Sequence, residues 1–287
     1  MKVVADDKIP FLRGVLETDG VAVDYRPGGK ITPEVLRGAD ALITRTRTRC
    51  NAALLADSPL RFIATATIGF DHIDTAYVES RGIHWTNAPG CNSSSVAQYI
   101  ASTLLRLAVG RGFALAGKTL GVVGVGNVGR KVAAVGRALG MKVLLNDPPR
   151  ARAEGAAGFN TLDEITAESD ILTFHVPLEH GGSDPTFHLV DAAFLARLAP
   201  GRILINSSRG EVVDNGALKQ ALAAKRLAAA VLDVWENEPG IDLELLGLLD
   251  YATPHIAGYS TDGKANGTAM SVNALAEFFG LSDRLRR

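Results

Sequence analysis

The sequence of 287 residues has few cysteines, almost no net charge and no long apolar run, and each absence excludes a class of protein. Its two cysteines are too few for a disulfide framework and fit a reducing compartment. A formal net charge of -1 gives no overall attraction to nucleic acid or to a membrane surface. No apolar run approaches the ~20 residues that span a bilayer. The charged start, MKVVADDKIP, leaves no apolar core for a signal peptide. We therefore expect a cytoplasmic protein without nucleic-acid or membrane partners.

Short apolar runs alternate with helix-like segments along the whole chain. The segments at 93–109 and 128–140 have helical length and helical apolar spacing. The alternation predicts an α/β fold whose parallel sheets are covered on both faces. The segment 148–160 is typical of a surface connection. Strands are predicted at 2–5, 40–44, 61–66, 119–126, 142–147, 170–176, 201–208 and 228–234.

Two turn-rich segments indicate domain boundaries. Pro, Gly, Asn and Ser cluster at 87–95, directly before a long helix. A second cluster at 254–263 precedes a last helix that ends near Phe279. The length fits one large or two medium domains.

The stretch ALITRTRTRC, residues 41–50, carries three arginines after an apolar run. If the strand continues, Arg45, Arg47 and Arg49 share one face and the threonines share the other. Two interpretations stay open. The arginines form a solvated basic edge that discourages pairing with other strands, or they bind an anionic substrate.

The stretch KTLGVVGVGNVGRKV contains Gly124, Gly126 and Gly129 in the spacing GxGxxG. An apolar strand enters this loop and an amphipathic helix leaves it, as in a dinucleotide site with the phosphates at the helix N-terminus. The next strand ends at Asp147, which can accept hydrogen bonds from the ribose of NAD and repel the extra phosphate of NADP. Alternatively, Asp147 is a turn residue before two prolines. The loop and the acid together predict NAD, although two arginines nearby complicate that choice.

Three other stretches place reactive groups at predicted strand ends: LINSSRGEVVD, VLDVWENEP and ATPHIAGYS. His255 can take the proton of an alcohol as hydride leaves. A carboxylate such as Glu238 would raise the pKa of that histidine, and the fork of Arg209 matches a carboxylate. Each residue alone also fits a structural role. Beside a nicotinamide they describe the oxidation of a 2-hydroxy acid. The sequence shows no zinc-ligand set and no nucleophile-elbow serine, so no metal is expected.

Taken in order, the motifs GVVGVGNVG, HVPL, LINSSRG, LDVWENEP and PHIAG resemble those of the D-2-hydroxyacid dehydrogenases, and the likeness covers essentially the whole chain. Within that family, VVADDKIP, FIATATIGFDHID, NAPGCNSSSVAQY, NDPPRA and HIAGYSTDGKANGT are similar to members that act on 4-phospho-D-erythronate. The resemblance implies an NAD-dependent oxidation to (R)-3-hydroxy-2-oxo-4-phosphooxybutanoate, in pyridoxal 5′-phosphate biosynthesis. The substrate would be a small, anionic, phosphorylated 2-hydroxy acid.

The resemblance also implies a role for each matched residue. Arg209 binds the substrate carboxylate, His255 is the acid/base on the C2 oxygen, and Glu238 supports His255. The matched substrate-contacting residues are Thr46, Thr67 and Tyr259, and our hypothesis is that Arg45 or Arg47 holds the phosphate while Arg49 faces solvent. The matched cofactor residues are Gly124, Gly126, Asn127, Val128, Gly129, Asp147, His175, Val176, Ser207, Ser208, Asp233 and Gly258.

The fold implied by the resemblance has two Rossmann-like domains. A discontinuous, flavodoxin-like substrate domain comprises residues 1–91 and 259–287, and a doubly wound NAD-binding domain comprises 92–258. Members of this kind continue into a C-terminal dimerisation domain, whereas the sequence stops at EFFGLSDRLRR. Because the family also pairs through the nucleotide domain, a homodimer is expected. Two alternatives stay open: another D-2-hydroxyacid dehydrogenase, acting on glycerate or 3-phosphoglycerate, or a non-catalytic scaffold that senses NAD.

Overall fold

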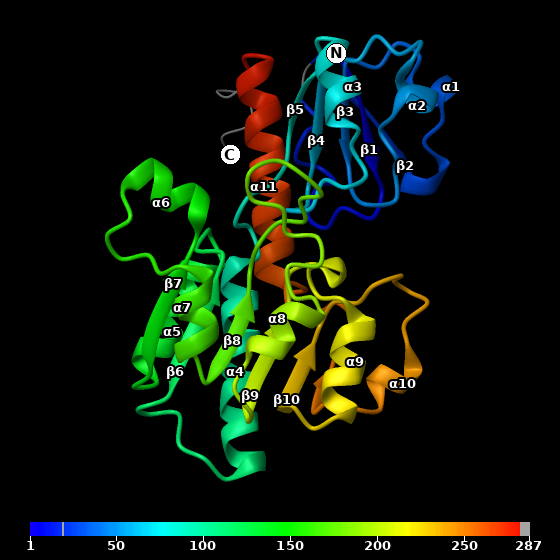
Figure 1. Cartoon of the computed structure of the whole chain (residues 1–287). Coiled ribbons are helices and arrows are strands. Elements are labelled where there is room, and N and C mark those ends of the chain that lie inside the picture. The colour runs from blue at the N-terminus through cyan, green and yellow to red at the C-terminus, as the bar shows by residue number, and fades with distance from the viewer. Residues whose placement is uncertain (19, 282–287) are drawn as a thin grey trace. The chain divides into compact units, whose positions relative to one another are not determined.

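The computed structural model describes residues 1–18 and 20–281, and the chain divides into two compact units. The first unit is Met1–Asn92 with Ser260–Arg287, and the second is Ser93–Tyr259. Each unit contains one sheet with helices around it (Figure 1). Every strand pair in both sheets is parallel, so the predicted α/β class is confirmed.

The first unit is built on five strands in the order β2-β1-β3-β4-β5, which is the flavodoxin-like order. Its elements are β1 (Lys2–Asp6), β2 (Ala22–Arg26), η1 (Gly28–Lys30), α1 (Pro33–Leu36), β3 (Ala41–Thr44), α2 (Ala52–Leu55), β4 (Phe62–Thr65), α3 (Thr75–Ser80), β5 (His84–Thr86) and α11 (Thr261–Phe278).

The central strands β3 and β4 are buried at every position because both faces of the sheet are covered. Leu42 and Ile63 pack into the cluster on one face, whereas Ile43 and Phe62 pack into the cluster on the other. The second cluster also contains Leu275 of α11, the red helix beside these strands in Figure 1. Alternate side chains of one strand therefore build two separate cores.

The second unit is built on six strands in the order β11-β10-β9-β8-β6-β7. Its elements are α4 (Ser93–Arg111), β6 (Thr119–Val123), α5 (Gly129–Ala138), β7 (Lys142–Asn146), α6 (Pro148–Glu154), α7 (Leu162–Glu168), β8 (Ile171–Phe174), α8 (Ala192–Arg197), β9 (Arg202–Asn206), η2 (Gly210–Val212), α9 (Asn215–Ala223), β10 (Leu227–Leu232), α10 (Leu243–Leu246) and β11 (Tyr251–Ala252).

The sheet of the second unit has a topological switch point at β6, which pairs with β7 on one side and with β8 on the other. From β6 the chain crosses to β7, and from β8 it crosses to β9, so the two connections run in opposite directions along the sheet. Ligands of open parallel sheets bind in the crevice that such a divergence creates. A cofactor site is therefore expected at the loops after β6 and β8.

All eight predicted strands are present, and the three strands that were not predicted lie at sheet edges. The strands β2, β5 and β11 each pair on one side only. β2 carries Asp24 and Arg26, β5 has three residues, and β11 has two. An edge strand needs little apolar surface, so the apolar runs that reveal buried strands are missing here.

One local prediction is wrong. The segment 148–160 is not a plain connection, because Pro148–Glu154 forms α6. Asp147 caps this helix by accepting a hydrogen bond from the Arg150 N–H, and prolines suit its first turn. Arg150 and Glu154 form an ion pair one turn apart. These local interactions stabilise a helix that has no buried residue.

The strand predicted at 40–44 is β3, and it does not continue into residues 45–50, the condition under which the arginines would share one face. β3 stops at Thr44, and the Thr48 N–H donates to the Arg45 carbonyl in a turn. The Thr48 hydroxyl then donates to the Gly28 carbonyl at 3.0 Å, which buries this side chain. The arginines therefore project from a turn and do not share one strand face.

Candidate active site

The loop Gly124–Gly129 after β6 is shaped so that only glycine fits at its two ends. Gly124 has a φ of 87°, and a Cβ there would collide with the carbonyl group of His175. A Cβ on Gly129 would overlap the Gly124 carbonyl. At Gly126, by contrast, a Cβ would meet nothing within 4 Å. The outer side of the loop is thus open to a ligand, as close approach of a pyrophosphate requires.

The start of α5 offers backbone donors to that ligand. Val128 stands at the N-cap position, and it provides no side-chain cap. The first N–H groups of a helix need acceptors, and a phosphate supplies them together with negative charge at the positive end of the dipole. Asn127 accepts a hydrogen bond from Arg130 at 2.7 Å, which places one cation beside the loop. The loop therefore fits NAD.

Asp147 follows β7 and lies next to this loop. Its Oδ2 accepts a hydrogen bond from the Val125 N–H at 2.8 Å, and its Oδ1 caps α6. The carboxylate oxygens retain lone pairs that could accept the ribose hydroxyls of NAD. The nearby cations are already paired, Arg150 with Glu154 and Arg152 with Asp184. This pairing weakens the case for either arginine as a partner of an NADP phosphate.

The residues after β8 and β9 line the other side of the switch point. The His175 Nε2 and the Thr173 hydroxyl oxygen lie 3.0 Å apart and share a hydrogen bond. Burial lowers the pKa of His175 to about 3. Its imidazole is therefore neutral. The next residue, Val176, lies close to Gly124. Ser207 has a buried hydroxyl with no hydrogen-bond partner in the described part of the chain. A buried polar atom of this kind is expected to bind a ligand or water.

The turn after β9 is held by Asn206. Its Oδ1 accepts hydrogen bonds from both the N–H and the hydroxyl of Ser208, and its amide donates to the Arg209 carbonyl. A Cβ on the following Gly210 would overlap the backbone of Trp235. Only glycine therefore lets this turn approach the loop after β10, which carries Glu238.

His255 and Glu238 form a close pair in the second unit. The His255 Nδ1 lies 2.9 Å from the Glu238 Oε2, and the other oxygen of Glu238 accepts the Trp235 N–H at 2.8 Å. His255 has a φ of 56°, a backbone conformation that residues other than glycine rarely adopt. Its N–H donates to the Asp233 carbonyl at 2.7 Å, which holds this backbone in place. His255 remains half-exposed and can reach a ligand.

Asp233 fixes the loop that carries His255. This carboxylate is 1% exposed and accepts hydrogen bonds from the Thr253 hydroxyl and from the N–H groups of Ile256 and Ala257. Because the Thr253 hydroxyl donates to Asp233, it accepts its second bond from Tyr99. The sequence suggested a cofactor contact for Asp233; its observed contacts are to the histidine loop. The predicted Gly258 follows this loop and is partly exposed.

The electrostatics of the pair suit proton transfer. The hydrogen bond to Glu238 raises the pKa of His255 above its ordinary value, although burial and Arg209 act in the opposite direction. Burial raises the pKa of Glu238, but the bonds from His255 and Trp235 outweigh burial and lower it overall. Glu238 is therefore ionised near neutral pH. Because Nδ1 faces Glu238, Nε2 is the nitrogen that can exchange a proton with a substrate.

These pKa shifts predict a pH dependence. Proton abstraction needs neutral His255, so kcat/KM for alcohol oxidation should rise with pH through a pKa above the ordinary value of 6.5. The reverse reduction needs the imidazolium and should fall over the same range. Glu238→Gln removes the negative charge and should move the rising limb to lower pH by about one unit. Initial rates of the wild type and the variant across pH measure this shift. A rising limb at the same pH in both proteins would contradict the pairing of His255 with Glu238.

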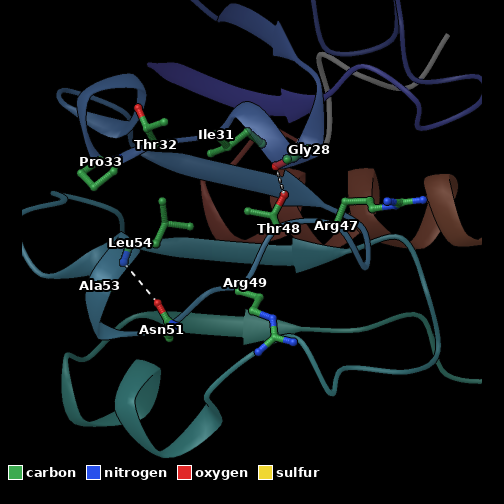
Figure 2. Close-up of a pocket in the computed structure, with 11 residues that line it drawn as sticks. Gly28, Ile31, Thr32, Pro33, Arg47, Thr48, Arg49, Asn51, Ala53 and Leu54 are labelled. Atoms are coloured by element: carbon green, nitrogen blue, oxygen red, sulfur yellow. Dashed lines mark hydrogen bonds between the residues drawn. The ribbon is translucent and has the colours of Figure 1, made fainter. Parts of the chain in front are cut away.

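The arginine turn of the first unit borders two cavities, each of about 410 Å³. The first cavity is lined by Gly28–Gly29, Ile31–Pro33, Arg47–Arg49, Asn51 and Ala53–Leu54 (Figure 2). The second is lined by Asp6, Lys8, Pro27–Gly29 and Arg45–Arg47. Figure 2 shows the guanidinium groups of Arg47 and Arg49 pointing in different directions. Arg49 is exposed, as expected, and it lines only the first cavity.

The predicted substrate residues lie in both units. Thr46 lines the second cavity together with Arg45 and Arg47. Thr67 follows β4, the strand that pairs with β3, so these residues come from neighbouring strand ends. Tyr259 belongs to the second unit and is 66% exposed. Within the first unit, the structure thus groups Arg45, Thr46 and Arg47 around one cavity.

Two features were not predicted from the sequence. Lys8 lines the same cavity as Arg45 and Arg47, and its carbonyl accepts a hydrogen bond from Arg45 at 2.8 Å. Its position just after β1, the neighbour of β3, was the available signal. The second is the pair of His188 and Glu236, which lie 2.6 Å apart. No local pattern links these two residues, because 48 positions separate them.

The chain matches the family model described as D-isomer specific 2-hydroxyacid dehydrogenase, NAD binding domain, over residues 99–257. The chain belongs to the D-2-hydroxyacid dehydrogenase family. It is therefore an NAD-dependent oxidoreductase, and the predicted family, enzyme class and cofactor are confirmed. Of the helices that the structure describes, none has the length and apolar character needed to cross a bilayer.

Curated relatives and solved structures extend this match over the whole chain. A Bacteroides fragilis protein named erythronate-4-phosphate dehydrogenase is 56% identical over 286 residues, covering 100% of this chain and 82% of the relative. A protein of the same name from Edwardsiella ictaluri is 49% identical, covering 98% and 74%. The crystal structure of D-lactate dehydrogenase from Aquifex aeolicus, complexed with NAD and lactic acid, has a TM-score of 0.81 at 27% identity, covering 100% and 97%.

Proposed function

We propose that this dehydrogenase oxidises 4-phospho-D-erythronate to (R)-3-hydroxy-2-oxo-4-phosphooxybutanoate, a step of pyridoxal 5′-phosphate biosynthesis. The observation that carries this choice of substrate is the 56% identity, over the full chain, to a protein named erythronate-4-phosphate dehydrogenase. The cavity bordered by Lys8, Arg45 and Arg47 supports it, because a phosphate needs cations.

The reaction removes a hydride from C2 and a proton from the C2 hydroxyl. NAD, when bound, accepts the hydride. His255 takes the proton on Nε2 while Nδ1–H stays bonded to Glu238, which stabilises the imidazolium that forms. Arg209 binds the carboxylate through its guanidinium fork. The bond from Asn206 to the Arg209 carbonyl and the packing of Gly210 fix the backbone from which this side chain extends.

The phosphate is assigned to Arg45 and Arg47 in the second cavity. Arg45 is held by its bond to the Lys8 carbonyl, whereas Arg47 extends from the turn (Figure 2). The buried Thr48 anchors that turn to Gly28. Asp6 also lines this cavity, so the three cations face one carboxylate and retain an excess of positive charge.

Arg47→Ala should raise KM for 4-phospho-D-erythronate by about tenfold or more, since a charge-assisted hydrogen bond contributes ~1.5–3 kcal/mol. Arg49→Ala is the matched control: this arginine lies two residues away, is also exposed, and is absent from the second cavity. The KM of the Arg49→Ala variant should stay close to that of the wild type. Steady-state kinetics with D-glycerate, which lacks the phosphate, should show little effect of either change. Equal KM values for both variants and the wild type would contradict the assignment of the phosphate to Arg47.

For the domain organisation, we propose that residues 1–91 and 259–287 bind substrate and that 92–258 bind NAD. We also propose a homodimer that pairs through the NAD-binding domain. Leu105 and Val109 of α4 support it, because they are 48% and 84% exposed and apolar. Light scattering on the purified chain tests the oligomeric state.

A further inference from the structure

One carboxylate joins three segments of the second unit that lie far apart in the sequence. The Glu236 Oε1 lies 2.6 Å from the His188 Nε2, and the Glu236 Oε2 accepts the Asn215 N–H at 3.0 Å. A carboxylate has no proton to donate, so the Nε2–H of His188 is the donor. The side chains of His188 and Glu236 are only 32% and 20% exposed. A hydrogen bond to a charged group in such a partly buried place is stronger than one between neutral groups.

His188 is held in place by its backbone and by its neighbours. Its N–H donates to the Glu211 carbonyl at 2.8 Å, and its φ of 48° is uncommon for a residue other than glycine. The imidazole stacks on Phe187, with the ring centroids 4.0 Å apart. The His188 Nδ1 lies 3.9 Å from the Asp214 Oδ2, and Asp214 caps α9 through its other oxygen. The imidazole is thus a fixed point to which Glu236 is bonded.

Through these bonds, His188 connects the two loops that carry Arg209 and Glu238. Glu211, which accepts the backbone N–H of His188, lies two residues after Arg209. Glu236, which accepts the side-chain N–H, lies two residues before Glu238. All of these residues belong to the second unit.

The loop that carries Glu238 turns sharply just before this residue. Asn237 has a φ of 59°, and its carbonyl accepts the Gly240 N–H at 2.6 Å. Glu238 must nevertheless keep its Oε2 within 2.9 Å of the His255 Nδ1. Glu236 directly precedes the turn, so its two bonds set the position from which the loop reaches the histidine.

We propose that His188 and Glu236 are positioning residues, which hold the carboxylate of Glu238 in its contact with the acid/base histidine. This inference rests on the assignment of His255 as acid/base in the proposed function. No hydrogen bond or ion pair in the described part of the chain joins either residue to His255, so both act through Glu238. When the anchor is lost, the carboxylate moves away from Nδ1, and the histidine loses the partner that favours its protonated form.

The test uses two variants that break the anchor and one that keeps it. His188→Asn tolerates a positive φ and keeps the backbone N–H, but its side chain is too short to reach Glu236. Glu236→Ala removes the carboxylate itself. Glu236→Gln is the conservative variant, because its amide can accept the Asn215 N–H and donate to a nitrogen of His188. Lys142→Gln is the control, since it removes an ion pair of 2.7 Å in the same unit, at the start of β7 and away from both loops.

Each variant that breaks the anchor should lower kcat by about tenfold, because a small displacement of a catalytic group has a large effect on the rate. The KM should stay within about threefold of the wild-type value, since the Arg209 turn keeps its bond to Asn206. The rising limb of kcat/KM should move to lower pH, because the other charged groups that influence His255, Arg209 and Asp233, are unchanged. Glu236→Gln and Lys142→Gln should retain the wild-type profile.

Fluorescence titration with NAD reports whether each variant is folded, and two disruptive variants allow one to decide if the other does not bind NAD. The double variant His188→Asn/Glu238→Gln shows whether the anchor acts through Glu238. If it does, His188→Asn should add little to the loss caused by Glu238→Gln alone. Losses that multiply in the double variant would overturn this inference.

A disruptive variant that binds NAD and keeps the wild-type kcat would also overturn this inference, as would one that loses activity with no shift of the pH limb. All rates are measured with the 2-hydroxy acid that the wild type oxidises fastest. A substrate other than 4-phospho-D-erythronate would therefore overturn the proposed function and leave this inference standing. A wild type that oxidises no 2-hydroxy acid would overturn both.

Discussion

Replacing His255 with glutamine is expected to lower kcat by about 10²–10⁴-fold, the usual contribution of a general acid/base. Glutamine is close to histidine in size and can donate a hydrogen bond to Glu238, but it cannot take a proton near neutral pH. The Glu238–His255 contact of 2.9 Å is therefore partly preserved, and the loss reports on proton transfer. Stopped-flow and steady-state rates of NADH formation measure it.

NAD binding provides the control for this variant. The glycine loop is formed by a different segment from His255, so the Kd for NAD should remain within about threefold of the wild-type value, below the ~1.4 kcal/mol that a tenfold change requires. The variant should also lose the rising limb of the pH profile. A variant that retains more than half of the wild-type kcat would show that another group takes the proton.

Replacing Arg209 with glutamine is expected to lower kcat/KM on the order of 10²-fold, because truncating one partner of a buried charge pair costs about 2–5 kcal/mol. Arg209 should bind the substrate carboxylate through two parallel N–H donors. Arg209→Lys keeps the charge but loses the planar fork, so it should recover only part of the activity. Substrate concentration series for the two variants measure the effect.

The pKa of His255 gives an independent control for Arg209. The positive charge of Arg209 lowers the pKa of His255, so its removal should move the pH limb of the variant slightly upward. This shift is expected only if the two side chains are close. A lysine variant with full activity would contradict the bidentate assignment.

Most of the second unit could be predicted from the sequence, because its chemistry is local. The loop from Gly124 to Gly129 uses glycine where a Cβ would collide with backbone, and such positions are visible in the sequence. The buried strands are apolar on both faces, so their runs are also visible. The structure places His255 against Glu238, as the ordered motifs indicated.

The remaining features depend on contacts between distant segments. Asp233 and Tyr99 support the histidine loop through Thr253, and neither contact has a local signal. The turn at Arg45–Arg49 depends on the distant Gly28 carbonyl, so the sequence alone left open whether the strand continued there.

The most direct test of the proposed function is the absorbance of NADH formed by the purified chain from NAD and each of three acids: 4-phospho-D-erythronate, D-glycerate and 3-phospho-D-glycerate. His255→Gln serves as the control. We expect the highest kcat/KM with 4-phospho-D-erythronate and almost no signal from the control. A higher kcat/KM with either other acid, or no turnover of any acid while NAD binds, would contradict the account.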